Sequence, residues 1–187
     1  MKIIPLAVFL LVVNFQLAYA PNTNIIIIPE SKPIIEKPII SSNWENEFKR
    51  WKNAMGFSEA SGNWTICNEL GCMGLYQFQQ TTLERLGFYG ITPELFKEDP
   101  FIFPPELQEQ ALRALIRTNA TDLKDIFKEY LGETIQDIEI TRSGLLAASH
   151  LAGVGGVIKF LKQDKNPKDK NGTSVACYLE KFKDYNI

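Results

Sequence analysis

The feature that most constrains this fold is a series of helix-start signals between residues 43 and 187. Thr92-Pro93-Glu94 and Pro104-Pro105-Glu106 each place proline in a first helical turn, where its missing N–H would have no helical partner. Thr121 and Thr141 precede two further runs of apolar residues at helical spacing, as helix caps do. The pattern predicts a mainly α domain of about eight helices.

The first predicted helix begins at Ser42 or Asn43 and continues past Gly56 to Glu59. Apolar residues at helical spacing define one buried face: Trp44, Phe48, Trp51 and Met55. Beyond this helix the composition changes to glycine and polar residues. The segment up to Phe78 therefore predicts one small β-hairpin or an irregular loop beside the end of the helix.

Shorter helices and one break complete the predicted domain. A break at Gly153–Gly156 is followed by a helix over Val157–Leu161, and 163–172 is predicted to be a polar loop. The other predicted helices begin at Thr81 or Thr82, at Asp122, at Arg142 and after Thr173, and end at Leu86, Tyr130, Leu151 and Phe182.

Residues 1–20 have the composition of a secretory signal peptide. Lys2 precedes the apolar run Ile3–Val13, and Ala18-Tyr19-Ala20 forms an A-x-A cleavage signature. The apolar run is shorter than the roughly 20 residues that a membrane-spanning helix needs, so a membrane anchor is the less favoured interpretation. We expect an exported protein, periplasmic or secreted, with no membrane span after cleavage.

Residues 21–42 alternate short isoleucine runs with proline. The prolines exclude a helix and predict an extended tether with polyproline character. The four consecutive isoleucines Ile25–Ile28 also fit a strand that docks on the domain or on a partner, although the sequence favours the tether. Residues 43–187 then form one domain, long enough to bury a proper core.

The charge and the aromatic content limit the classes of partner. The formal net charge is −2 and no basic block is present, so nucleic acid is not an expected partner. Aromatic residues make up 11% of the chain, which in an exported protein favours sugar or peptide contacts. The sequence does not indicate an oligomeric state.

Three cysteines lie in the predicted domain. Export permits a disulfide, and a Cys67–Cys72 bridge would hold the loop beside Glu59. Pairing of either cysteine with Cys177 is an alternative that the sequence leaves open. Together with the lone His150 these cysteines lack the paired spacing of a zinc site, so no metal is predicted.

Glu59 is the candidate catalytic acid. Cleavage of a glycosidic bond requires a proton on the leaving oxygen, and a carboxylic acid supplies it most readily where its charged form is disfavoured. Burial against aromatic rings has this effect, and four aromatic residues lie close in sequence: Phe57, Trp64, Tyr76 and Phe78. A glutamate exposed at a helix end is the alternative.

Two segments around Glu59 carry a resemblance to a known family. Glu59-Ala60-Ser61-Gly62-Asn63 followed by Gly74-Leu75-Tyr76-Gln77-Phe78 resembles the lysozyme-like superfamily, most closely its soluble lytic transglycosylase and goose-type lysozyme branch. Glu59 matches the catalytic glutamate of that family. Ala60 stands where serine is usual, and Tyr76 stands where methionine is usual.

Two later segments extend the resemblance over about residues 44–182. Ser149-His150-Leu151-Ala152-Gly153 is similar to the family's Ala-Tyr-Asn-Ala-Gly segment in its small residues, but it lacks the tyrosine and the asparagine. Val175-Ala176-Cys177-Tyr178-Leu179 resembles the closing Tyr-Val helix, with Tyr178 at the tyrosine. The order and spacing of the segments carry the resemblance, since each is weak by itself.

The resemblance implies a lysozyme-like fold whose cleft binds peptidoglycan glycan strands without a metal or cofactor. It implies substrate-binding positions in that cleft for Tyr76, Gln77, His150 and Tyr178. The alternatives are core packing for the two tyrosines, a loop-bracing amide for Gln77 and a buried core position for His150.

The resemblance also implies a reaction. A hydrolase usually needs a second carboxylate, and Glu69, the only other acid in 57–78, is expected to be solvated in a loop. The family's one-glutamate mechanism fits better, in which Glu59 acts first as acid and then as base and the product carries a 1,6-anhydro ring. The alternatives are a hydrolytic muramidase of the same fold, a non-catalytic peptidoglycan-binding or assembly protein, and an unrelated helical interaction module.

Overall fold

The computed structural model describes residues 42–187, so the predictions for the signal peptide and for 21–41 lie outside the described residues. About 60% of the described residues are helical, which confirms the mainly α class. The elements are α1 (Ser42–Ala60), α2 (Gln80–Arg85), α3 (Pro93–Glu98), the 3₁₀ helix η1 (Pro100–Ile102), α4 (Pro105–Asp122), α5 (Lys124–Tyr130), β1 (Thr134–Ile135), β2 (Ile138–Glu139), α6 (Arg142–Gln163) and α7 (Val175–Lys181).

Helix α1 forms because its apolar residues fall on one face, which the rest of the domain covers. Three side chains on this face are at most 1% exposed: Phe48, Trp51 and Met55. Trp44 stacks on Phe48 near the start of the helix, with ring centroids 5.2 Å apart. The predicted buried face is therefore confirmed, and it determines which way the helix presents its last turn.

The last turn of α1 carries Glu59. Gly56 does not interrupt the helix, and its missing side chain makes room for Leu75, whose carbon atoms would lie 2.7–3.0 Å from a Cβ at this position. The helix ends where Ser61 adopts a left-handed backbone conformation with φ of 50°. The contact of Leu75 with Gly56 thus brings the segment 74–78 against the turn that holds Glu59.

The segment between α1 and α2 is an irregular loop with isolated β-bridges. Met73 pairs with both Cys67 and Phe78, and Met73 and Phe78 exchange two backbone hydrogen bonds of 2.9 Å. The four residues between them form a tight loop in which Gly74 and Gln77 have positive φ. Of the two predicted forms of this segment, the irregular loop is confirmed.

The two short helices that follow differ in how they begin. The hydroxyl of Thr92 accepts a 3.3 Å hydrogen bond from the N–H of Leu95, which confirms the predicted start of α3. The predicted caps at Thr81 and Thr82 are wrong, because α2 begins at Gln80. Gln79 precedes that helix without a side-chain cap.

Helices α4 and α5 are consecutive, with only Leu123 between them. Helix α4 begins at Pro105 as predicted, and it buries one face: Leu107, Gln108, Ala111, Leu112, Leu115 and Asn119. The predicted cap at Thr121 is wrong, because this residue still belongs to α4. Its hydroxyl donates a 2.9 Å hydrogen bond to the carbonyl of Arg117.

A two-stranded antiparallel sheet follows α5. Ile135 of β1 lies opposite Ile138 of β2, and the two residues between them, Gln136 and Asp137, both have positive φ. That conformation is the one that two-residue hairpin turns require. The sequence pattern did not predict this hairpin, because each strand contains only two residues.

Helix α6 packs against α4 and α7 and is kinked at Gly153, which has non-helical φ and ψ of 68° and 167°. The hydroxyl of Thr141 accepts a 3.2 Å hydrogen bond from the N–H of Gly144, as predicted. The predicted break is confined to Gly153, and the helix continues to Gln163. By length and composition α6 is apolar enough to cross a membrane. However, 56% of its most apolar 18-residue stretch is buried within the domain, as in the core helix of a folded domain.

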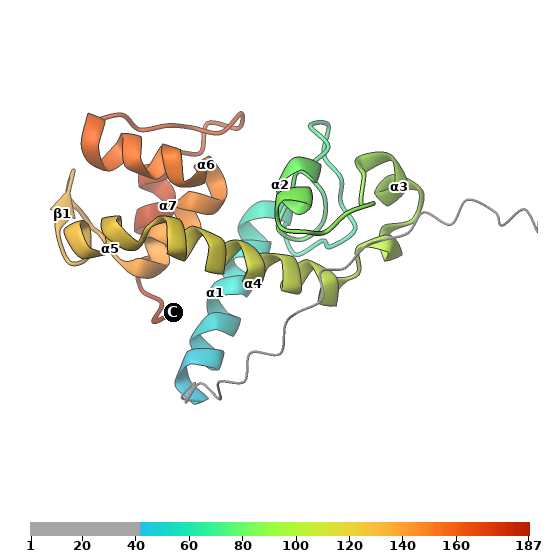
Figure 1. The fold of residues 1–187 in the computed structure, drawn as a ribbon, viewed down its shortest axis with the longest axis horizontal. Coiled ribbons are helices and arrows are strands. Elements are labelled where there is room, and N and C mark those ends of the chain that lie inside the picture. The colour runs from blue at the N-terminus through green and yellow to red at the C-terminus, as the bar shows by residue number, and fades with distance from the viewer. Residues whose placement is uncertain (1–41) are drawn as a thin grey trace, which may run out of the picture.

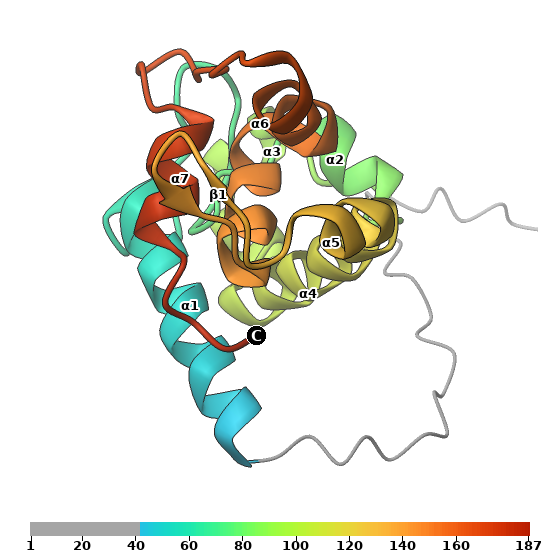
Figure 2. The ribbon, with the colours of Figure 1, turned by 90° about the vertical axis from the view of Figure 1, so that its left-hand side faces the viewer.

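Helix α7 lies between α1 and α6, with the β1–β2 hairpin beside it (Figure 2). Ser174 caps it by accepting a 3.2 Å hydrogen bond from the N–H of Cys177, so the cap predicted at Thr173 is off by one residue. The helix approaches α6 closely because Gly144 has no side chain: a Cβ there would lie 2.8 Å from the carbonyl oxygen of Leu179.

Candidate active site

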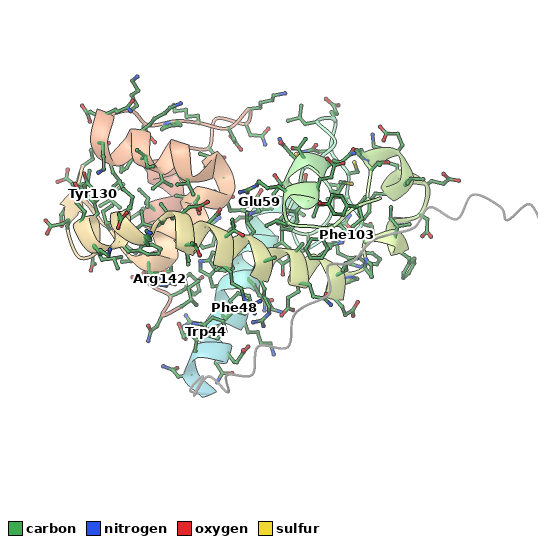
Figure 3. All side chains as sticks on the ribbon, in the orientation of Figure 1. Trp44, Phe48, Glu59, Phe103, Tyr130 and Arg142 are labelled. Atoms are coloured by element: carbon green, nitrogen blue, oxygen red, sulfur yellow. The ribbon has the colours of Figure 1, made fainter. Side chains whose placement is uncertain are left out.

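A cleft of about 840 Å³ opens between two parts of the domain. One wall comes from α6 and the segment that precedes α7, the other from the loop before α2 and from α2 itself, and α4 passes beneath both (Figure 1). Figure 3 places Glu59 where the two walls meet. Helix α4 contributes three residues to the cleft: Leu115, Asn119 and Asp122.

Glu59 reaches the cleft from the last turn of α1, with a side chain that is 15% exposed. Its Oε1 accepts a 2.6 Å hydrogen bond from the hydroxyl of Tyr178. The same oxygen lies 3.8 Å from Nε2 of His150. Oε2 has no hydrogen bond to any residue within 42–187. One carboxyl oxygen is therefore fixed, and the other is available to a ligand in the cleft.

Tyr178 is a permanent hydrogen-bond donor to Glu59. The residue is 4% exposed. Burial, and then the charge and hydrogen bond of Glu59, raise the pKa of its hydroxyl well above the usual value. The hydroxyl therefore keeps its proton throughout the ordinary pH range. The ring is held against Phe182, with centroids 5.2 Å apart.

His150 is held beside Glu59 by the backbone of the opposite wall. Its side chain is 8% exposed, and Nε2 lies 2.9 Å from the carbonyl oxygen of Tyr76. A carbonyl only accepts, so Nε2 carries the hydrogen in this contact. Nδ1 is buried and has no hydrogen-bond partner in the described part of the chain. The imidazole thus connects α6 to the loop that lies next to Glu59.

The two remaining predicted site residues, Tyr76 and Gln77, lie in different environments. Tyr76 is 2% exposed, its ring packs edge-on against Phe78, and burial raises the pKa of its hydroxyl to about 12. Its side chain belongs to the core and does not line the cleft, so the predicted sugar contact is replaced by core packing. Gln77 does line the cleft. Its Nε2 donates a 2.9 Å hydrogen bond to the carbonyl of Gly74, so it also braces the loop.

Gln108 supports this loop from α4, and no sequence motif indicated it. It is fully buried. Its Oε1 accepts a 2.6 Å hydrogen bond from the N–H of Leu75, while its Nε2 donates to the carbonyls of Trp64 at 2.9 Å and Phe103 at 2.7 Å. Gly74 lies directly against the amide. The signal in the sequence was a polar residue on the inward-facing side of an amphipathic helix.

Charged side chains of both signs line the cleft. They are Glu59, Asp122 and Asp169, and Arg85, Lys168 and Lys170. Asp169 stabilises its own loop, because its Oδ1 accepts a 2.7 Å hydrogen bond from the N–H of Thr173. Asp122 forms no ion pair with another described residue. Glu69 is exposed and does not line the cleft, which agrees with the solvated position expected for it.

The three cysteines are free, and the predicted Cys67–Cys72 bridge is not formed in this structure. Cys72 lines the cleft, while Cys177 is exposed. Burial raises the pKa of the Cys67 thiol. Between residues 42 and 187, no group of three or more His, Cys, Asp and Glu side chains is arranged to hold a metal ion.

Comparisons of the chain with protein-family models, with curated proteins and with solved structures gave no match. Assignment of a function therefore depends on the geometry of the site. That geometry is a largely buried carboxyl group at a helix end, fixed on one oxygen by Tyr178 and approached by His150, in a cleft of about 840 Å³.

Proposed function

We propose that this protein is a lytic transglycosylase with a lysozyme-like fold, which cleaves the β-1,4 bond between N-acetylmuramic acid and N-acetylglucosamine in peptidoglycan. The observation that carries the proposal is the position of Glu59, nearly buried in the cleft with one oxygen fixed by Tyr178 and the other available. Export, predicted from residues 1–20, would deliver the protein to the compartment that contains this substrate.

The convergence of distant segments supports the proposal. Glu59, the loop 74–78, His150 and Tyr178 come from four separate elements, and each was singled out by resemblance to one enzyme family. In the fold Tyr178 contacts Glu59 directly, and His150 contacts both Glu59 and the loop. An unrelated helical interaction module would give no reason for these four segments to meet at one carboxyl group.

The proposed reaction needs only one carboxyl group. The free oxygen of Glu59 delivers its proton to the leaving glycosidic oxygen while the C1–O bond breaks. The N-acetyl group of the substrate stabilises the positive charge that develops at C1. Glu59, now a carboxylate, accepts the proton of the C6 hydroxyl as O6 bonds to C1. The proton returns to Glu59, and the product is a 1,6-anhydro sugar.

Tyr178 has a defined part in this cycle. Its hydroxyl donates to Glu59 in both protonation states, and the bond strengthens when Glu59 becomes charged, since hydrogen bonds to ionised acceptors are stronger. The contact therefore stabilises the carboxylate that forms as the glycosidic bond breaks. It also holds the carboxyl group in one rotation, with the other oxygen directed to the substrate.

A hydrolytic muramidase is the second candidate, and Asp122 is the observation that favours it. A hydrolase uses a second carboxylate to activate water or to form a covalent intermediate. Asp122 lines the same cleft as Glu59 and has no ion-pair partner in the described part of the chain. Asp122 is exposed at the end of α4 and would supply the hydrolytic mechanism with a second carboxylate in the cleft, which the loop residue Glu69 does not.

Digestion of purified peptidoglycan, analysed by mass spectrometry, tests the proposal. A transglycosylase releases anhydro-muropeptides, and Glu59→Gln abolishes their release because the amide cannot donate the proton. Glu69→Gln is the matched control, since this exposed glutamate lies outside the cleft. Products heavier by one water would identify a muramidase. Binding without any cleavage, unaffected by Glu59→Gln, would identify a non-catalytic wall-binding protein.

A further inference from the structure

A buried polar pair that the proposed reaction does not use lies in the cleft. Asn119 of α4 and Ser149 of α6 are each 3% exposed, and both line the cleft. Nδ2 of Asn119 donates a 2.9 Å hydrogen bond to the hydroxyl of Ser149. That hydroxyl in turn donates a 2.8 Å hydrogen bond to the carbonyl oxygen of Leu146.

The direction of these hydrogen bonds determines what Asn119 offers to a ligand. The carbonyl of Leu146 only accepts, so Ser149 uses its single proton there. Ser149 can then only accept from Asn119, which requires the NH₂ side of the amide to face the serine. Oδ1 of Asn119 has no hydrogen-bond partner within 42–187. Oδ1 is not enclosed, since Asn119 lines the cleft, so this oxygen is available to accept a hydrogen bond from a ligand there.

His150, which follows Ser149, also has a hydrogen-bond acceptor that no described residue uses. Its Nε2 donates to the carbonyl of Tyr76, which leaves Nδ1 as a buried acceptor without a partner among the described residues. Asn119 therefore presents its unused acceptor Oδ1 to the cleft, together with the second N–H of the same amide, whereas Nδ1 of His150 is enclosed. A ligand that complements Oδ1 of Asn119 supplies an N–H or O–H group to it.

The apolar surroundings indicate which donor fits. Leu115 lies one helical turn before Asn119 on α4, is 5% exposed and lines the cleft. Ala152 lines it from α6. An acceptor beside an apolar surface matches an acetamido group, which carries an N–H donor close to a methyl group. A sugar hydroxyl supplies the donor but not the methyl group.

We propose that Asn119 recognises the 2-acetamido group of a sugar bound in the cleft. Oδ1 accepts the N–H of that group, Leu115 contacts its methyl, and Ser149 holds the amide of Asn119 in the required orientation. The inference rests on the proposed function and adds a specificity-determining residue to it. It makes the protein selective for N-acetylated glycans over glycans that carry only hydroxyl groups.

The test uses the Glu59→Gln protein, which keeps the cleft but does not turn over its ligand. Calorimetry measures its affinity for tetra-N-acetylchitotetraose and for cellotetraose, which has a hydroxyl in place of each acetamido group. Adding Asn119→Leu removes the acceptor at nearly constant volume. We expect affinity for the acetylated probe to fall about tenfold, the effect of one hydrogen bond, and affinity for cellotetraose to stay the same.

Two further variants complete the test. Asn53→Leu makes the same change at an exposed position of α1 outside the cleft, and it leaves both affinities unchanged. Ser149→Ala keeps Asn119 but frees its amide to turn, so affinity for the acetylated probe alone falls about threefold. Ser149→Ala decides the question if thermal unfolding shows that Asn119→Leu does not fold.

The outcomes separate the inference from the proposed function. Equal losses on the two probes would overturn the acetamido assignment, because a hydroxyl would then be the donor. Unchanged affinities in both cleft variants would overturn the role of Asn119, while binding by the Glu59→Gln parent would leave the proposed function standing. Failure of that parent to bind the acetylated probe would overturn both.

Discussion

Tyr178 donates its hydroxyl hydrogen to Oε1 of Glu59 across 2.6 Å, although 119 residues separate the two in the chain. The contact depends on the close approach of α7 to α6, which Gly144 permits because it has no side chain. It also depends on the end of α1 at Ser61, which leaves Glu59 in the last helical turn. The site is therefore assembled by helix packing rather than by local sequence.

Replacement of Tyr178 by phenylalanine tests this contact. The ring and its packing on Phe182 are retained, but the donor to Glu59 is lost. A hydrogen bond to a charged group contributes about 1.5–3 kcal/mol, so we expect turnover to fall about 10- to 100-fold with KM nearly unchanged. Initial rates of anhydro-muropeptide release measure the effect. Tyr185→Phe, on a tyrosine outside the cleft, is the control, and equal rates for the two variants would contradict the role of Tyr178.

Local signals in the sequence predicted much of the fold. The caps at Thr92 and Thr141 and the prolines at the start of α4 were confirmed, because capping depends on atoms within one helical turn. The cap of α7 was misplaced because Thr173 and Ser174 are adjacent and either side chain can cap a helix. The cap at Thr121 failed because packing continued α4 beyond it.

The site was harder to predict, since burial depends on contacts between distant segments. Tyr76 and Tyr178 are the same residue type and both are buried, yet only Tyr178 reaches Glu59. Neighbours in sequence do not distinguish these two outcomes. Gln108 and Asn119 left a weaker signal, as polar residues on the inward side of α4, and each proved to have a specific hydrogen-bond partner.

Gln108→Leu is expected to destabilise the domain strongly. The change removes three hydrogen bonds and leaves the N–H of Leu75 and the carbonyl of Trp64 in the loop, and the carbonyl of Phe103 before α4, without their partner. The loss of several buried hydrogen bonds predicts a fall of about 3–5 kcal/mol in the free energy of unfolding, measured by urea denaturation. Gln110→Leu makes the same change on the exposed side of α4 and is expected to alter stability by about 0.5 kcal/mol or less. Similar stabilities of the two variants would show that Gln108 does not support the loop.

Gly74→Ala tests the fit between the loop and α4. A Cβ at this position would lie 2.5–2.8 Å from the amide atoms of Gln108, and φ of 76° is itself unfavourable for alanine. We expect a loss of about 2–3 kcal/mol in unfolding free energy, together with lower activity, because the loop and His150 must shift. Gly132→Ala separates the two causes, since its φ is 84° but nothing lies within 4 Å. It should lose only about 1–2 kcal/mol, and equal losses would show that the collision is unimportant.

Acid is expected to weaken the contact between α1 and α4 through Glu109. Burial alone would raise the pKa of this carboxyl group, but hydrogen bonds from Lys52 and Arg113 outweigh burial and lower the pKa below its ordinary value of 4.5. A lowered pKa means that the contribution of Glu109 is fully present above the unfolded value. That contribution is lost as the pH falls through the folded value.

Glu109→Gln measures this contribution. Because these side chains are partly exposed and screened by solvent, the variant should lose only about 0.5–1 kcal/mol in unfolding free energy at neutral pH. The difference between the two proteins should shrink as the pH falls below the lowered pKa, and also in about 1 M salt. Urea denaturation across the acid range follows both effects. Glu106→Gln, at an exposed glutamate without an ion-pair partner in the described domain, should show no such trend. A difference for Glu109→Gln that is constant from neutral to acid pH would mean that packing of the side chain, and not its charge, stabilises the contact.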